Sequence, residues 1–246
     1  MDQFWDFFSF PLNFILAMLW MVGFGLLWKH KTESYIIRFL LSPAATIISL
    51  SLLLCFGLMI GFGVNCNLVH SLPFVLSLLF VQTVVYVVTL RGWKTPSGRI
   101  RWRFLLIHAG FLIALGSAFW GAPDAYELRV QLQKGQTSQV AYEMNGSMRG
   151  LGYEIELKDC NTEYSMSGMP TYHVAVISLD GEEDVSITVN HPYRVRYGED
   201  IYLTSLSEDG RCVLQIVHEP WKYFAIAGII MLIVGALMLF FKVPGR

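Results

Sequence analysis

The stretch that decides the fold is Phe104–Trp120, FLLIHAGFLIALGSAFW, which is apolar throughout apart from His108. As an α-helix these seventeen residues are about 25 Å long, which is just enough to cross the hydrocarbon core of a bilayer. An imidazole inside such a segment is costly unless it has a hydrogen-bond partner, a metal or a cofactor. His108 is therefore the first candidate functional residue.

The predicted helix has two different faces. Small residues recur along one side, and this spacing predicts close packing against another helix. These residues are Gly110, Ala114, Ser117 and Gly121. His108 lies on the opposite side, among bulky aromatic and aliphatic residues. These neighbours are Phe104, Phe111, Leu112, Leu115 and Phe119. One face is thus suited to helix packing, and the other offers a nitrogen ligand in apolar surroundings.

The composition predicts a membrane protein, because 54% of the residues are hydrophobic and only 15% are charged. About five transmembrane α-helices are expected. Four lie within residues 1–121, at about 11–28, 39–64, 68–90 and 104–120, and the fifth lies with a short tail within residues 222–246. The predicted fold class is a five-helix membrane protein with an extracytoplasmic, mainly-β domain, residues 122–221, between helices four and five.

The charges are strongly segregated and predict the orientation. Residues 122–221 hold sixteen acids and seven bases, whereas the rest of the chain holds three acids and eleven bases. With five helices, ten bases and one acid, Glu33, fall on the same side, which the positive-inside rule makes cytoplasmic. The N-terminus and residues 122–221 are then outside and the C-terminus is inside. This pattern is typical of membrane topology, and no nucleic-acid partner is expected.

Residues 122–221 show the alternation of apolar and polar residues that is typical of β-strands. About six strands are predicted, at 127–133, 153–157, 172–179, 185–189, 201–205 and 213–218. Two Asp-Gly pairs, Asp180-Gly181 and Asp209-Gly210, lie between such runs and indicate hairpin turns. Six strands in about 100 residues suit a small sandwich or an open barrel.

The cysteines form no recognisable motif. None of Cys55, Cys66, Cys160 and Cys212 belongs to a Cys-x-x-Cys pair, so zinc, thioredoxin-like and covalent haem sites are not indicated. Cys160 and Cys212 face an oxidising compartment in the predicted topology. A disulfide between them and two separate thiols are equally compatible with the sequence.

The remaining histidines are weaker candidates than His108. His30 lies in a basic flank, His70 begins a helix at the outer surface, and His173 lies in a predicted strand. His191 and His218 belong to the outer domain and have no ligand at a useful spacing. For His108 itself, a ligand role and a plain interhelical hydrogen bond remain equal alternatives. The chain contains no GxSxG, P-loop or HExxH motif, so it is not expected to be catalytic alone.

Three segments of the chain carry a resemblance to a known family. RFLLIHAGF, residues 103–111, has an H-x-G just after a basic loop and resembles a helix of the ResB-type (CcsB) family. Val189-Asn190-His191-Pro192, followed by Gly198, Ile201-Tyr202 and Ser205, is similar to the family's VN-x-P…G…IY…S segment before its last helix. Residues 41–61 are similar to the family's opening helix. The order and spacing agree from about Leu41 to the C-terminus.

The resemblance implies a subunit of the System II pathway of cytochrome c maturation, in the bacterial inner membrane. There a ResB-type subunit works with a CcsA-type membrane protein, which carries a tryptophan-rich outer segment that is missing here. Together they form a holocytochrome c synthase (haem lyase) complex that transports haem b outward and presents it to apocytochrome c. The family's transmembrane histidine is an axial ligand of the haem iron, and His108 occupies the matching position. The implied partners are the CcsA-type protein, apocytochrome c, haem and the lipid bilayer.

Two departures and two alternatives accompany this resemblance. The helix at residues 11–28 is additional, and the outer domain is shorter than in many relatives.

Arg99, Arg101 and Arg103 either set the topology or pair with haem propionates, and the topological role is favoured. A haem-binding anchor of a quinol or electron-transfer complex is the alternative function, but a resident cytochrome b usually has at least two intramembrane histidines. A purely structural module that docks a partner is the third possibility.

Overall fold

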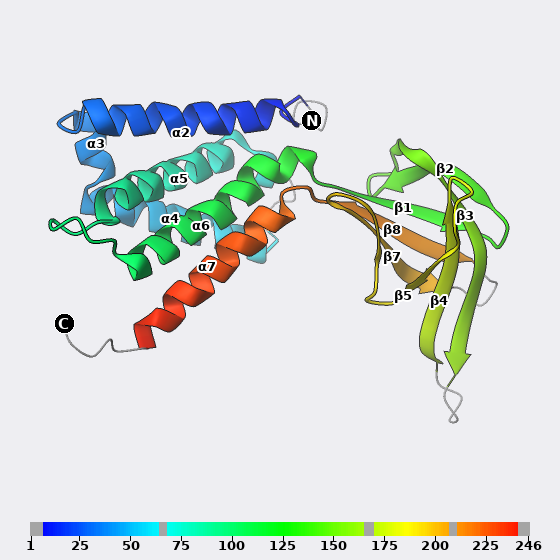
Figure 1. Ribbon diagram of the computed structural model, residues 1–246. Helices are drawn as coiled ribbons and strands as arrows, with labels where there is room; N and C mark the ends of the chain where they lie inside the picture. The colour runs from blue at the N-terminus through cyan, green and yellow to red at the C-terminus, as the bar shows by residue number, and fades with distance from the viewer. Residues whose placement is uncertain (1–6, 64–67, 165–169, 207–210, 241–246) are drawn as a thin grey trace. The chain divides into compact units, whose positions relative to one another are not determined.

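The computed structural model describes residues 7–63, 68–164, 170–206 and 211–240 (Figure 1). It divides into two compact units. The helical unit comprises Met1–Pro123 and Trp221–Arg246, and the sheet unit comprises Asp124–Pro220. The predicted fold class, a membrane protein with about five spanning helices and a mainly-β domain, is confirmed.

Five helices in the described residues are long and apolar enough to span a bilayer. They are α2 (Leu12–His30), α4 (Pro43–Gly61), α5 (Leu72–Gly92), α6 (Trp102–Gly121) and α7 (Lys222–Phe240). Local signals set where two of them begin. The Ser42 hydroxyl accepts a hydrogen bond from the Ala45 backbone N–H, and the Ser71 hydroxyl accepts one from Phe74. A proline in the first turn of both helices supports these starts, because its missing N–H would have no helical partner there.

The prediction of a single helix over 39–64 is wrong at its start. A short helix, α3 (Tyr35–Leu40), ends before Leu41, and α4 begins at Pro43. Ser42 between them is extended, with φ −77° and ψ 153°, because the ring of a following proline disfavours the helical conformation. The prediction of a helix over 68–90 also differs at its ends. Its first residues form a 3₁₀ turn, η1 (Leu68–His70), and the α-helix α5 runs from Leu72 to Gly92.

Helices α6 and α7 pack through the predicted stripe of small residues, side by side in Figure 1. A Cβ atom added at Gly110 would lie 2.8 Å from the Gly228 carbonyl oxygen and 2.9 Å from the Leu232 nitrogen. One added at Gly228 would lie 2.6 Å from the Ala114 nitrogen. The two backbones therefore touch, and the small residues of both helices make this approach possible.

Replacing Gly110 by alanine should consequently destabilise the helical unit. The added methyl group has no space between the backbones, and overpacking of this kind costs about 1–3 kcal/mol. Gly116→Ala on the same helix is the matched control, because its Cβ would make ordinary contacts, 3.8 Å from the Gln82 Oε1 atom and 4.0 Å from the Trp120 Cδ1 atom. Both variants gain the same helix propensity, so the difference isolates packing. Thermal unfolding of the detergent-solubilised protein measures it, and equal melting temperatures would contradict the close contact.

The sheet unit is one antiparallel sheet with the strand order β5-β4-β3-β2-β1-β8-β7-β6. Its eight strands are β1 (Tyr126–Leu132), β2 (Thr137–Glu143), β3 (Met148–Tyr164), β4 (Pro170–Leu179), β5 (Val185–Thr188), β6 (Tyr193–Arg196), β7 (Glu199–Leu206) and β8 (Cys212–His218). The predicted number of about six is therefore too low. Strand β2 buries only Ala141 and shows no clear alternation, and β6 alternates over only four residues, which is too short a run to mark a strand.

The sheet curls around a single apolar core and forms an open barrel. Alternate residues of most strands face this core, for example Leu128, Val130 and Leu132 of β1. Ile187 near one edge and Ile201 near the other belong to the same cluster, which shows the curling. The predicted turn at Asp180-Gly181 is confirmed, with φ values of 51° and 75°. The other predicted turn, Asp209-Gly210, lies outside the described residues.

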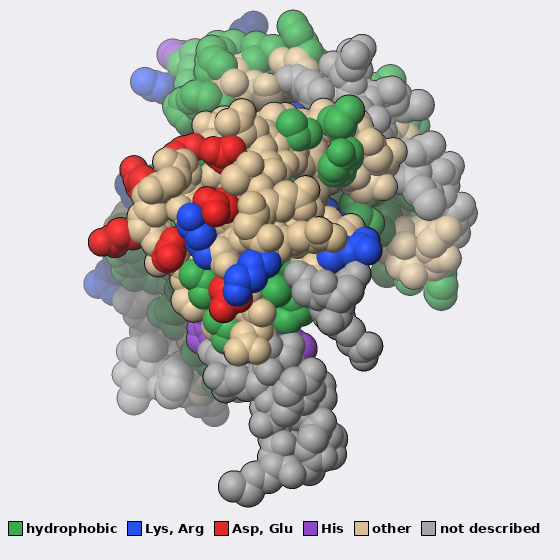
Figure 2. Space-filling model, turned by 90° about the vertical axis from the view of Figure 1, so that its right-hand side faces the viewer, with side chains coloured by type: hydrophobic (Ala, Val, Ile, Leu, Met, Phe, Trp, Pro, Cys, Tyr) green, Lys and Arg blue, Asp and Glu red, His purple; other side chains and the backbone are tan. Residues whose placement is uncertain are grey.

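Part of the surface of the sheet unit is charged. Figure 2 shows Asp and Glu side chains gathered on part of one face, with Lys and Arg side chains among them. Several are paired, as in the exposed ion pairs Lys134–Asp159 at 2.6 Å and Arg129–Glu127 at 3.5 Å. Exposed pairs of this type contribute little stability, about 0–1 kcal/mol each.

Candidate functional site

His108 lies in the second turn of α6 and is partly buried. Its Nδ1 atom is 2.9 Å from the Phe104 carbonyl oxygen, one turn earlier in the same helix. A carbonyl oxygen can only accept, so Nδ1 carries the proton and Nε2 of the neutral ring keeps its lone pair. No other hydrogen bond of His108 occurs within the described residues. The hydrogen bond thus lies within α6. The alternative considered for His108, a hydrogen bond between two helices, would have required a partner on another helix.

Phe104 covers one face of this imidazole. The two rings are stacked, with centroids 3.9 Å apart and planes 22° from parallel. The Phe104 ring also packs against Gly92 at the end of α5, where it leaves no room for a Cβ atom. The Arg101 guanidinium lies 4.9 Å from the Phe104 ring centre and donates a 3.3 Å hydrogen bond to the Gly92 carbonyl. These contacts fix the position of the Phe104 ring, and the stacked ring in turn restricts the orientation of the His108 imidazole.

A groove of about 390 Å³ adjoins Phe104, where α4 begins, α5 ends and α6 begins. Its lining consists of Leu41, Pro43, Thr46, Val88, Arg91, Gly92, Arg101 and Phe104. Of the three arginines considered for propionates, the structure places Arg101 in this lining but neither Arg99 nor Arg103. Arg91 joins it there, and sequence reasoning had counted Arg91 only among the topological charges.

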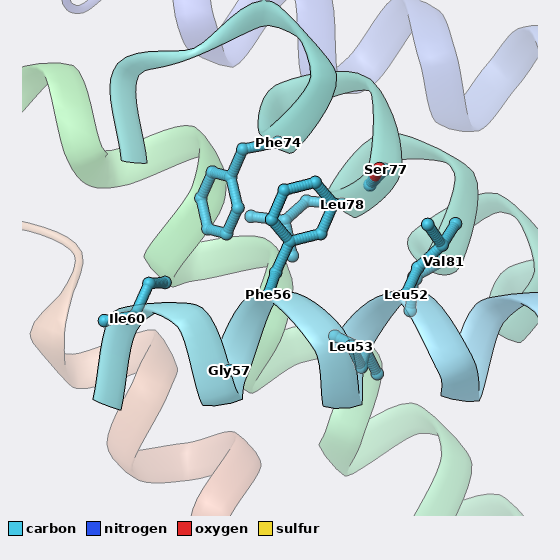
Figure 3. A pocket seen from close by; sticks show the side chains of 9 residues that line it. All are labelled: Leu52, Leu53, Phe56, Gly57, Ile60, Phe74, Ser77, Leu78 and Val81. Atoms are coloured by element: carbon cyan, nitrogen blue, oxygen red, sulfur yellow. The ribbon is translucent and has the colours of Figure 1, made fainter. Parts of the chain in front are cut away.

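A second pocket, of about 190 Å³, lies between α4 and α5 (Figure 3). The rings of Phe56 and Phe74 approach each other edge to face, with centroids 5.4 Å apart. Ser77 supplies the one hydroxyl of the lining, and its oxygen donates a 2.7 Å hydrogen bond to the Pro73 carbonyl. This pocket can therefore accommodate an apolar group, but it offers no ligand for a metal.

Polar side chains attach the additional first helix to the rest of the helical unit. Buried Asn13 of α2 donates a 2.7 Å hydrogen bond to the Trp120 carbonyl of α6. The Trp20 indole donates to the Thr83 hydroxyl, and the Tyr86 hydroxyl donates to the Met21 carbonyl. Such bonds stabilise helix association in a membrane by about 0.6 kcal/mol each. Sequence reasoning missed them because each polar residue lies singly within an apolar run.

The sheet unit contains a polar cluster around Glu199 that the sequence did not reveal. The Glu199 carboxylate is buried and accepts hydrogen bonds from four side chains. These are the hydroxyls of Tyr126 at 3.0 Å and Tyr153 at 2.8 Å, Nη2 of Arg196 at 2.8 Å, and Nδ1 of His218 at 3.1 Å. Strand register explains the meeting, because His218 stands opposite both Glu199 on β7 and Tyr126 on β1. No regular spacing in the sequence marks these five residues.

The electrostatics of this cluster favour the charged carboxylate. Burial by itself raises the pKa of Glu199, but the hydrogen bonds from His218, Arg196 and Tyr153 outweigh it and lower the pKa to about 2. Burial, together with the hydrogen bond to Glu199, raises the pKa of Tyr153. The Tyr126 and His218 rings are stacked 4.6 Å apart. All four donors are satisfied by one carboxylate, so the cluster locks the register of β1, β7 and β8.

The weaker candidate ligands are not brought together. Within the described residues, no group of three or more His, Cys, Asp or Glu side chains could hold a metal ion. His191 lies in the link between β5 and β6, after Asn190, whose φ of 67° makes the turn before Pro192. Cys160 and Cys212 are not joined by a disulfide, and burial raises the pKa of the Cys212 thiol to about 12. The structure thus contains two thiols where a disulfide was one of two alternatives.

Part of the chain matches a known protein family. Residues 98–212, from the loop before α6 to the first residue of β8, match the ResB-like family. No curated protein matches the chain. A solved structure, Cytochrome c Heme Lyase CcmF, is similar over 95% of this chain, at 13% sequence identity and a TM-score of 0.42. This chain spans 46% of that protein. The match agrees with the resemblance inferred from RFLLIHAGF and VNHP, and it makes residues 98–212 similar to the ResB-like family.

Proposed function

We propose that this chain is a membrane subunit of the System II machinery of cytochrome c maturation. It binds haem b within the membrane through His108, together with a CcsA-type partner, and assists attachment of the haem to apocytochrome c. The ResB-like match over residues 98–212 supports the pathway. The subunit is one component of a haem lyase complex and does not catalyse the attachment alone.

The observation that carries this proposal is the hydrogen bond from His108 Nδ1 to the Phe104 carbonyl. A histidine ligand commonly donates its second ring nitrogen to a carbonyl or carboxylate, which sets the tautomer and the ring orientation. His108 is already in this arrangement, with Nε2 left to coordinate. Neutral imidazole is a good ligand for haem iron, so the residues present fit the group. When bound, haem supplies an iron whose axial positions accept such nitrogens.

The chain supplies one such ligand, and a partner has to supply the other. Among the described parts of the helical unit, His30 ends α2 and His70 lies in η1, so only His108 is in a helix interior. The face of α6 used for α7 carries Gly110, opposite His108. His108 is only partly buried, so its imidazole stays within reach of a partner helix. A shared site of this kind explains why a single intramembrane histidine suffices.

The proposed location is the bacterial inner membrane, with the sheet unit outside. With five spanning helices, ten bases and one acid fall on the same side of the membrane, which the positive-inside rule makes cytoplasmic. This count supports an extracytoplasmic location for the sheet unit. In this orientation the sheet unit meets the compartment in which apocytochrome c receives its haem. Alkaline phosphatase fused after Gly121 should be active and fused after Arg103 inactive, and the reverse pattern would exclude this orientation.

The proposal is tested by haem content with and without the partner. The chain should be purified alone and in complex with a co-expressed CcsA-type subunit, and haem should be quantified by absorption spectroscopy. Because the iron site needs a ligand from each subunit, we expect haem in the complex and at least tenfold less in the chain alone. Equal, stable haem in the chain alone, with a spectrum unchanged by the partner, would instead favour a resident electron-transfer cytochrome.

A further inference from the structure

The groove beside Phe104 combines two kinds of lining at one end of the helical unit. Arg91 and Arg101 contribute guanidinium groups, and Leu41, Val88 and Phe104 contribute apolar walls. Three helix ends form it: the start of α4, the last turn of α5 and the start of α6. The ends of spanning helices lie at the level of lipid headgroups. The groove thus occupies the depth at which a lipid changes from polar to apolar.

Within the described residues, no acidic side chain neutralises the positive charge of this groove. Among the residues that the structure describes, neither Arg91 nor Arg101 forms an ion pair with a carboxylate. Arg101 donates one hydrogen bond, to the Gly92 carbonyl, which is uncharged. In the sequence, Glu33 is the one acid on the side that carries ten bases. Two guanidiniums facing an open groove favour a phosphate or carboxylate ligand.

We propose that the groove binds an anionic phospholipid, with its phosphate between Arg91 and Arg101 and the start of one acyl chain against the apolar walls. The volume of about 390 Å³ suits a headgroup and the upper part of a chain, not a whole lipid. Basic pockets between spanning helices are a known type of site for anionic headgroups. The bound lipid would neutralise the ends of α5 and α6 and hold Arg101 over Phe104, next to His108.

The groove geometry favours a lipid over the propionates of haem. His108 does not line the groove, whereas Phe104, whose ring covers one face of the imidazole, forms part of its wall. A haem coordinated by Nε2 of His108 would therefore not lie in the groove itself. This inference does not depend on haem binding, and the experiment below separates the two.

The full chain in detergent should be titrated with phosphatidylglycerol or phosphatidylcholine, and bound lipid counted by native mass spectrometry. We expect one tightly bound phosphatidylglycerol and weaker phosphatidylcholine binding. In Arg91→Gln/Arg101→Gln the affinity for phosphatidylglycerol should fall about 30-fold, since each base near an anionic headgroup contributes about a fivefold factor. Lys94→Gln/Arg99→Gln is the matched control, because it removes two charges from the same loop but no groove residue, and its affinity should change less than threefold.

A second variant tests the space rather than the charge. Thr46 is exposed and lines the groove, so Thr46→Trp should fill it and abolish the tight binding while all bases remain. Unchanged lipid binding in both the Arg91/Arg101 variant and the Thr46 variant would overturn the proposal. An equal loss of lipid affinity in the Lys94/Arg99 control would show that the bases attract the lipid only diffusely, and this result would also overturn the proposal. If the Arg91/Arg101 variant retained lipid but lost haem from the partner complex, the groove would hold propionates instead.

Discussion

Replacement of His108 by glycine is expected to remove haem from the complex with the CcsA-type partner and to abolish holocytochrome c formation. The variant deletes the Nε2 atom that the Phe104 hydrogen bond leaves free, and with it the proposed axial ligand. A haem content at least tenfold lower than that of the unmodified complex is expected, because a partner cannot replace a ligand inside the membrane. Protein abundance should stay near normal, since the imidazole makes its one hydrogen bond within α6.

Two comparisons make this result specific. Added imidazole is small enough to occupy the vacated space and should restore part of the haem content and of cytochrome maturation. His30→Gly removes an exposed histidine at the end of α2 and should leave both unchanged. Absorption spectra of the purified complexes and haem staining of the mature cytochrome measure the effect. Full haem content in His108→Gly would show that His108 only caps the Phe104 carbonyl and stacks on its ring.

Replacement of Glu199 by glutamine should destabilise the sheet unit by about 3 kcal/mol at neutral pH. Folding lowers the pKa of this carboxyl from its ordinary value of 4.5 to about 2, and each pKa unit corresponds to about 1.4 kcal/mol. A loss of stability of this size is typical when one partner of a buried, hydrogen-bonded charge pair is removed. Glutamine has the same shape but lacks the charge that Arg196 and His218 donate to.

The pH dependence of this stability has a definite sign. The pKa is depressed in the folded state, so the contribution is complete above about pH 4.5 and is lost as the pH falls toward 2. Denaturant unfolding of the full chain, followed by circular dichroism of the sheet at several pH values, measures it. Glu127→Gln is the control, because Glu127 forms an exposed pair with Arg129 and its loss should cost under about 1 kcal/mol. If Glu199→Gln kept the same acid sensitivity as the unmodified chain, another carboxyl would be responsible.

The sequence by itself determined the features that depend on local composition and period. Five apolar runs make spanning helices, whatever their partners, because a bilayer requires every backbone polar group to be bonded within the segment. The stripe from Gly110 to Gly121 determined a close helix contact, since small residues at this spacing always share one face. Alternation identified most strands, and the isolated His108 stood out because an ionisable residue is rare in such a run.

The tertiary structure alone decided which distant residues meet. Tyr126 and Glu199 are separated by 73 positions and Asn13 and Trp120 by 107, and no periodic pattern connects such partners. Strand order placed His218 between Glu199 and Tyr126, and the contact of α5 with α6 placed Gly92 under the Phe104 ring. That contact, with the hydrogen bond inside α6, decides how His108 is oriented. Pairwise packing sets these arrangements, and its energy depends on three-dimensional neighbours that a linear sequence does not specify.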